Sequence, residues 1–196
     1  MLLDEDFLVL DRVSRHQFLA ALQRIAEGGV TQLIMTTHRA SEMIPAIGVV
    51  LRLKIGKIVH NGPRPDPTAP VKAEQAARPA TLVTDAWAKA DSKKGALIRL
   101  EKASVFLDGS PVLDGLDWEF HTGEHWVISG GNGAGKSTFL RLLRGEVTPA
   151  LGGIIERFGS SKRLPIWEIG ERIAMLSPAL QARFRETMPI KKAVAS

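Results

Sequence analysis

Apolar residues recur along the first 60 positions in two different rhythms. Between Ser14 and Ala26 they return every three or four positions, which predicts an amphipathic helix with Ser14 as N-cap and Gly28 at its end. Short apolar runs surround this helix, and the later ones form a hairpin around Gly56. The runs cover residues 2–3, 31–36, 47–53 and 57–59. Strand, helix and strand in this order predict an α/β fold with a parallel sheet.

The next stretch, residues 61–95, lacks such a rhythm and contains 5 of the 11 prolines. These prolines are Pro63, Pro65, Pro67, Pro70 and Pro79. Because a segment of this composition does not bury a core, we expect it to be an extended linker.

Strand-like patterns return after the linker. The runs at 96–105, 116–120 and 126–129 predict strands, with a turn at Asp108-Gly109. A glycine-rich loop then leads into a predicted helix over residues 136–144, and residues 178–196 show no strong pattern.

Composition narrows the protein class. The 196 residues carry a net charge of +5 and no cysteine, which excludes disulfides and thiolate metal sites. No apolar run approaches the roughly 18 residues of a spanning helix, and the acidic start is not that of a signal peptide. We therefore expect a cytoplasmic protein without a transmembrane span, and a peripheral association with the inner membrane stays open. Lysine pairs such as Lys191-Lys192 are too short for a nucleic-acid tract, so nucleic acid is not expected as a partner.

The glycine-rich loop fits the phosphate-loop pattern of Gly, four residues, Gly, Lys and Ser or Thr. Its residues are Gly130, Gly131, Asn132, Gly133, Ala134, Gly135, Lys136 and Ser137, followed by Thr138. A predicted strand enters this loop and a predicted helix leaves it, so backbone N–H groups and the positive helix end can hold phosphates. In such loops the lysine, here Lys136, reaches the β- and γ-phosphates, and the hydroxyl of Ser137 binds Mg²⁺. The sequence therefore predicts a nucleotide site.

Hydrolysis of a nucleotide needs a carboxylate near Mg²⁺ and a group that orients water. No apolar strand after Lys136 ends in Asp or Asp-Glu. Asp4 and Glu5 follow the apolar residues at the start of the chain, so their order relative to the phosphate loop is reversed for one ordinary domain.

These segments resemble the ATP-binding cassette (ABC) ATPases. GGNGAGKST is similar to the Walker A loop of that family, and residues 104–130 resemble its N-terminal β-subdomain. The resemblance implies that Phe106 stacks on adenine, although a core-facing strand residue is equally compatible with the pattern.

Two segments near the N-terminus carry the rest of the resemblance. LLDEDFLVLD resembles the Walker B and D-loop run, which implies that Asp4 lies beside Mg²⁺ and that Glu5 is the general base. TQLIMTTHRASE resembles the switch region, which makes His38 the histidine that senses the γ-phosphate. The alternatives are a surface acidic cluster for Asp4 and Glu5 and a structural role for His38. FGSSKRLPIWEIGERIAMLSP is similar to tandem ATPases of the molybdate-associated or photorepair type.

The order of these motifs divides the chain into two incomplete domains. Residues 1–60 resemble the C-terminal part of one nucleotide-binding domain, residues 61–95 a linker, and residues 96–196 the N-terminal part of another. No LSGGQ-like signature is present, and Pro178 stands at the position of the family's Q-loop glutamine. We interpret the chain as the middle of a tandem ABC protein. A more speculative possibility is that the two halves assemble into one permuted core.

The resemblance implies an ATPase of the P-loop NTPase fold that uses ATP and Mg²⁺ and pairs with a second ABC domain or a homodimer partner. A truncated, non-catalytic remnant is the alternative: it would bind nucleotide weakly or need a complementary chain. The remaining candidates are structural. We expect His121 and His125 on a solvated turn rather than at a metal, and Trp118, Trp126 and Trp167 in packing.

Overall fold

The computed structural model describes residues 1–4, 10–39, 42–64 and 95–177. Most of the expected linker, the tail from Pro178 and the candidate base Glu5 lie outside these residues. We call the described residues up to 64 the first segment and residues 95–177 the second segment.

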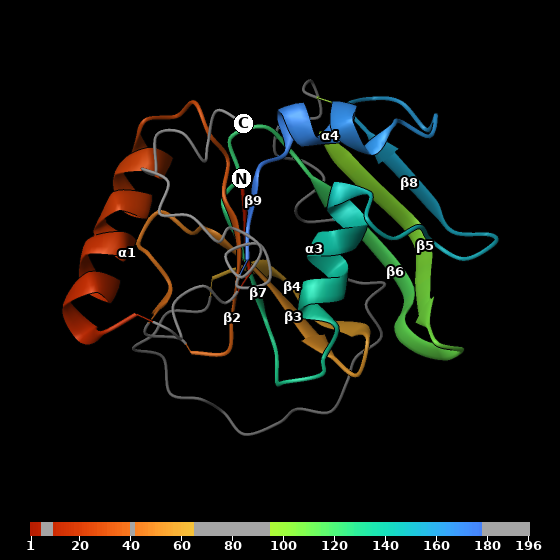
Figure 1. Ribbon diagram of the computed structural model, residues 1–196, viewed down its shortest axis with the longest axis horizontal. Coiled ribbons are helices and arrows are strands. Elements are labelled where there is room, and N and C mark those ends of the chain that lie inside the picture. Colours follow the sequence, from red (N-terminus) through yellow and green to blue (C-terminus); the bar gives the residue numbers. More distant parts are fainter. Residues whose placement is uncertain (5–9, 40–41, 65–94, 178–196) are drawn as a thin grey trace, which may run out of the picture.

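A six-stranded sheet forms the centre of the molecule (Figure 1), with the strand order β4-β3-β7-β2-β1-β9. Its strands are β1 (Leu2–Asp4), β2 (Ile34–Thr37), β3 (Val49–Lys54), β4 (Lys57–Pro63), β7 (Trp126–Ser129) and β9 (Met175–Leu176). The pairs β1–β2, β1–β9, β2–β7 and β3–β7 are parallel, and the β3–β4 hairpin is antiparallel. The expected parallel sheet and hairpin are therefore confirmed.

The strand order interleaves the two segments. Strand β7 of the second segment lies between β2 and β3 of the first, and β9 pairs with β1. The backbone N–H and C=O groups of β7 consequently find their ladder partners on strands more than 70 positions away in sequence. The two halves thus share one sheet, as in the permuted core that the order of the motifs left open.

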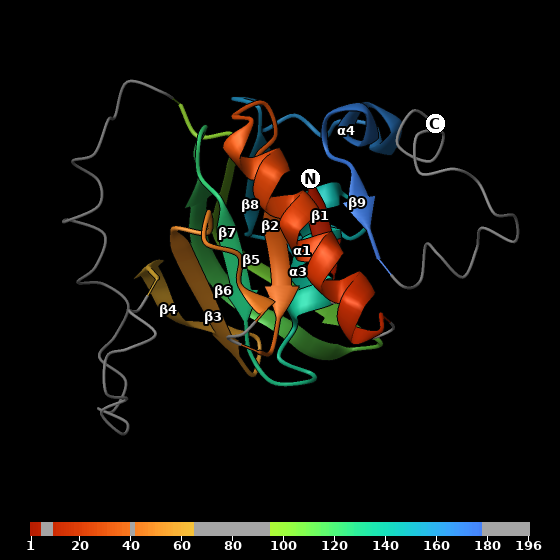
Figure 2. The same ribbon diagram turned by 90° about the vertical axis from the view of Figure 1, so that its left-hand side faces the viewer.

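Helix α1 (Arg12–Glu27) covers one face of this sheet (Figure 2). Asp11, not Ser14, is its N-cap: one carboxylate oxygen of Asp11 accepts the backbone N–H groups of Val13 and Ser14, both at 2.9 Å. The Ser14 hydroxyl donates to the second carboxylate oxygen at 2.9 Å. Asp is as good an N-cap as Ser, and its two oxygens accept the two N–H groups and the Ser14 hydroxyl at the same time. The helix therefore starts earlier than its apolar periodicity indicates. Gly28 ends the helix as expected.

The opposite face packs against α3 (Lys136–Arg144) and a second sheet of order β6-β5-β8. This sheet contains β5 (Ile98–Leu107), β6 (Ser110–Phe120) and β8 (Ile154–Arg157), and α4 (Ile166–Arg172) follows it. Within the described part of the chain, no helix is long and apolar enough to cross a membrane.

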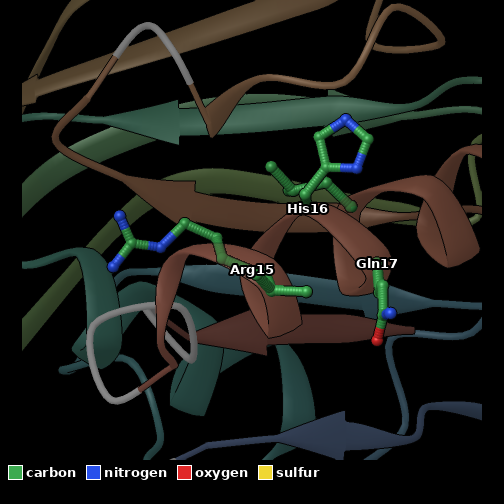
Figure 3. Close-up of a pocket in the computed structure, with 5 residues that line it drawn as sticks. Arg15, His16 and Gln17 are labelled. Carbon is green, nitrogen blue, oxygen red and sulfur yellow. The ribbon is translucent and has the colours of Figure 1, made fainter.

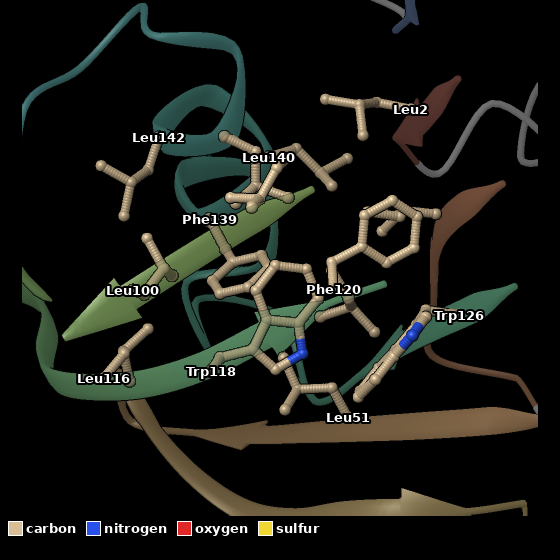
Figure 4. Close-up of a cluster of buried hydrophobic side chains, with 14 of the residues drawn as sticks. Leu2, Leu51, Leu100, Leu116, Trp118, Phe120, Trp126, Phe139, Leu140 and Leu142 are labelled. Atoms are coloured by element: carbon tan, nitrogen blue, oxygen red, sulfur yellow. The ribbon is translucent and has the colours of Figure 1, made fainter. Parts of the chain in front are cut away.

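The larger core contains an aromatic cluster of the second segment against which the first segment packs aliphatic side chains (Figure 4). The Trp118 ring lies 5.1 Å from the Phe139 ring and 5.3 Å from the Trp126 ring, both edge-on. Leu2 and Leu51 of the first segment belong to the same buried cluster. Since apolar burial contributes about 25 cal/mol per Å², this shared core adds to the strand pairing in holding the two segments together.

Candidate functional site

Three parallel strands of the central sheet end side by side, and each is followed by a predicted site residue. Strand β1 ends at Asp4, β2 leads into His38, and β7 leads into the phosphate loop. In open α/β sheets, ligands bind at the carboxyl ends of the strands. The structure therefore brings the motifs from both ends of the chain to the edge where a ligand site is expected.

The phosphate loop joins β7 to α3, both of which have the predicted bounds. Gly135 caps α3 in the left-handed region, with φ 99°, and no side chain caps the helix. A Cβ at Gly135 would lie 2.7 Å from Leu113 Cδ2 and 3.0 Å from the Val112 carbonyl oxygen, so the position requires glycine. The positive end of α3 therefore faces the loop, and such a helix start favours an anion.

Lys136 lies folded into this loop. Its side chain is 5% exposed, and Nζ donates to the carbonyl oxygens of Gly130 and Gly131, both at 3.0 Å. A charged ammonium held among loop carbonyls is positioned to turn toward a bound phosphate.

Asp4 and Ser137 meet although 133 positions separate them. Ser137 Oγ donates to Asp4 Oδ1 at 3.0 Å, and the buried Thr36 hydroxyl donates to the same oxygen at 2.9 Å. A carboxylate beside a hydroxyl is the oxygen donor set that suits Mg²⁺. The residues present therefore fit the metal that the sequence implies, and Asp4 and Ser137 are the residues that would hold it.

His38 directly follows β2 and is exposed. Its Nε2 accepts a hydrogen bond from Arg39 Nε at 3.2 Å. Arg39 in turn faces the buried carboxylate of Glu42, with 3.9 Å between Arg39 Nη1 and Glu42 Oε1. The ring thus stands at the carboxyl edge of the sheet with one nitrogen already engaged.

Phe106 is 54% exposed near the end of β5. The alternative of a core-facing strand residue is therefore wrong, and an exposed ring is free to stack on a planar ligand. The expected general base, Glu5, lies outside the described residues.

Sequence reasoning missed two polar residues near the site, Thr36 and Glu42. Both are buried. Thr36 donates to Asp4, and Glu42 accepts a hydrogen bond from Thr37, the residue before His38. A polar residue within an apolar strand, as Thr36 is in LIMTTH, was the available signal.

His125 differs from the expected solvated turn. Its Nδ1 accepts the backbone N–H of Leu33 at 3.1 Å, and partial burial lowers the pKa of the imidazole. The neutral His125 ring thus connects the residue before β7 to Leu33, the residue before β2.

An open hollow beside α1 lies apart from the residues described above (Figure 3). It is lined by side chains from the start of that helix, among them Arg15, His16 and Gln17. None of the site residues that the structure describes lines it, so the strand ends and phosphate loop remain the candidate site.

Comparison with known proteins agrees with this geometry. The ABC transporter family model matches residues 113–190, a stretch that includes the phosphate loop. The ABC transporter ATP-binding protein ModF of Escherichia coli is 28% identical over 206 aligned positions that cover 100% of this chain. This chain is similar to the ATP-binding proteins of the ABC family.

Two further relatives show how far the similarity extends. The uncharacterized ABC transporter ATP-binding protein C323.04 of Schizosaccharomyces pombe is 27% identical over 94% of this chain. The hemin import ATP-binding protein HmuV of Rhodopseudomonas palustris is 38% identical over 45% of it. The chain spans 42% of the length of ModF and 38% of that of C323.04. The ABC similarity thus covers both segments and rests on less than half of these longer proteins.

Proposed function

We propose that this chain binds ATP with Mg²⁺ and hydrolyses it as the ATP-binding part of an ABC system. The observation that carries the proposal is the contact between Asp4 Oδ1 and Ser137 Oγ at 3.0 Å. It brings an aspartate at the end of an apolar strand, which the sequence after Lys136 lacks, to the hydroxyl where Mg²⁺ is expected.

Each residue then has a role in the proposed site. The N–H groups of the phosphate loop and Lys136 hold the phosphates, and Asp4 and Ser137 hold Mg²⁺, which neutralises phosphate charge when bound. Phe106 stacks on the adenine, and His38 contacts the γ-phosphate. Glu5 would take the proton of the attacking water, a role that rests on its position in the Walker B-like run.

A partner completes this proposal. The sequence contains no LSGGQ-like signature, so we propose that a second ABC domain or a second copy of the chain supplies one across the phosphate loop. We expect the isolated chain to bind MgATP more readily than it turns ATP over, and to act in the cytoplasm.

The test measures MgATP binding by calorimetry and phosphate release by the same protein. We expect Lys136→Ala to abolish binding, Asp4→Asn to weaken binding in Mg²⁺ but not in EDTA, and Glu5→Gln to abolish turnover while preserving binding. Lys102 is exposed, so Lys102→Ala serves as the matched lysine control.

The outcomes separate the candidate functions. Binding without turnover above the Lys136→Ala background would leave the non-catalytic remnant as the function of this chain. Absence of Mg²⁺-dependent ATP binding in folded protein would refute the proposed site.

A further inference from the structure

One buried acidic residue near the site has no role in the proposed function. Glu42 is 4% exposed and lies four positions after His38. Removing a carboxylate from water is costly unless donors compensate it, so its partners indicate what it does.

The first partner is the Thr37 hydroxyl, which donates to Glu42 Oε2 at 2.5 Å. Thr37 is 1% exposed and is the last residue of β2, directly before His38. The Thr37 oxygen also accepts the backbone N–H of Arg39 at 3.0 Å. The hydroxyl therefore ties together the backbone on both sides of His38. It also lies 3.3 Å from the Arg39 carbonyl oxygen, and Glu42 is the nearer of its two acceptors.

The second partner is the Arg39 side chain. Its Nη1 lies 3.9 Å from Glu42 Oε1, and its Nε donates to His38 Nε2 at 3.2 Å. Glu42 Oε1 is buried and makes no hydrogen bond, so this guanidinium is its charge partner among the described residues. The buried carboxylate thus reaches the imidazole through Arg39 as well as through the backbone.

We propose that Glu42 is a positioning residue for His38, acting through the Thr37 hydroxyl and the Arg39 guanidinium. The two contacts set the backbone turn and hold Nε2 of the ring as a hydrogen-bond acceptor. The role in turnover rests on the proposed function, whereas the placement of the ring is independent of it.

Two substitutions separate the two contacts. Thr37→Val removes the hydroxyl at nearly constant volume, and Thr37→Ser restores it. Glu42→Gln keeps an oxygen for Thr37 but removes the charge that faces Arg39. Glu27→Gln, an exposed carboxylate of α1 that accepts from Gln23 Nε2 at 2.8 Å, is the control for a neutralised glutamate.

The first readout is the ¹⁵N spectrum of the histidine rings in the full chain without nucleotide, with His38 assigned from His38→Gln. We expect wild-type His38 to show Nε2 as acceptor, and Thr37→Val and Glu42→Gln to change that signal while the other 4 of the 5 histidines stay unchanged. Thr37→Ser and Glu27→Gln should match the wild type.

The second readout is turnover. We expect kcat to fall about tenfold in Thr37→Val and Glu42→Gln, because a small displacement of a reacting group slows the step without altering ground-state binding. The Kd for MgATP should change less than about twofold, and Thr37→Ser should recover most of kcat.

The two readouts distinguish the two ideas. An inactive wild type would refute hydrolysis, and the histidine spectrum would then decide the positioning alone. An unchanged His38 signal in folded Thr37→Val and Glu42→Gln, or a tenfold loss that Thr37→Ser does not recover, would overturn the proposal. If Glu42→Gln fails to fold, the Thr37→Val and Thr37→Ser pair still gives the answer.

Discussion

Replacing Gly56 with alanine tests how the two segments fit together. Gly56 is in the turn between β3 and β4, with φ 72°, and its N–H donates to the Ala134 carbonyl oxygen of the phosphate loop at 3.2 Å. Its own carbonyl oxygen accepts the Asp114 N–H at 3.0 Å. The turn of the first segment is therefore bonded to the phosphate loop and to strand β6 of the second.

The magnitude follows from the geometry. A Cβ at Gly56 would lie 2.4 Å from the Val112 carbonyl oxygen, about 1 Å short of an ordinary contact. The left-handed conformation costs alanine about 1–2 kcal/mol. Moving the turn by about 1 Å would also break or lengthen both hydrogen bonds, each worth about 0.5–1.5 kcal/mol. Gly56→Ala should therefore lower the free energy of unfolding by about 2–5 kcal/mol.

Gly29→Ala is the matched control, because Gly29 has φ 68° and nothing within 4 Å of its added Cβ. It should cost only the conformational term of about 1–2 kcal/mol. Urea denaturation followed by tryptophan fluorescence measures both variants, since Trp118 and Trp126 are buried in the shared core. The difference between the variants, about 1–3 kcal/mol, isolates the contact between the segments.

A second effect concerns nucleotide binding. Folded Gly56→Ala should bind MgATP more weakly than wild type because the displaced turn moves Ala134 in the phosphate loop. Gly29→Ala should bind as wild type does. Equal unfolding free energies for the two variants, within about 0.5 kcal/mol, would refute the interleaved arrangement of the segments.

Three further predictions concern the neighbourhood of the site. Arg157→Met should lower the free energy of unfolding by about 2 kcal/mol in urea, because the buried guanidinium donates to the carbonyl oxygens of Leu142 at 2.6 Å and Leu143 at 2.8 Å at the end of α3. Stability should fall as the pH drops below about 6.5, because burial lowers the pKa of His125 and the unfolded chain then binds the extra proton; denaturation between pH 5 and about 8 measures this slope. Phe106→Ala should raise the Kd for MgATP about tenfold in calorimetry, because the exposed ring would no longer stack on adenine.

Each of these has its own control. Arg99→Met removes an exposed ion pair with Glu101 and should cost less than about 1 kcal/mol, so a similar loss in both arginine variants would contradict the role of Arg157. His125→Asn keeps an acceptor for the Leu33 N–H without titrating, and an unchanged pH slope in that variant would exclude His125 as its source. Phe106→Ala should leave the affinity for inorganic triphosphate unaltered; an equal loss for both ligands would argue against stacking.

Arg157 is buried but remains charged at neutral pH. Desolvation lowers the pKa of its guanidinium to about 10, which still leaves the side chain charged at pH 7. A charged donor at the C-terminus of α3 stabilises the helix whose other end carries the phosphate loop. The contact therefore links the small sheet to the proposed nucleotide site.

The sequence by itself determined the local elements and the chemistry of the phosphate loop. Strand 126–129 and helix 136–144 have their predicted bounds, because apolar periodicity and glycine positions act over a few residues. Strand 31–36 instead runs over residues 34–37, because pairing with β1 and β7, not its own pattern, selects which residues join the ladder.

Only the tertiary structure decided which residues meet. Trp167, expected in packing, is 72% exposed, whereas Trp118 and Trp126 are buried. The sequence around the three tryptophans is similarly apolar, so the local pattern does not distinguish the exposed one from the buried ones. The contact between Asp4 and Ser137 crosses 133 positions, and no local pattern encodes a contact at that separation. It arises because β7 needs backbone partners on both sides and finds them in β2 and β3, which brings β1 and its carboxylate to the phosphate loop.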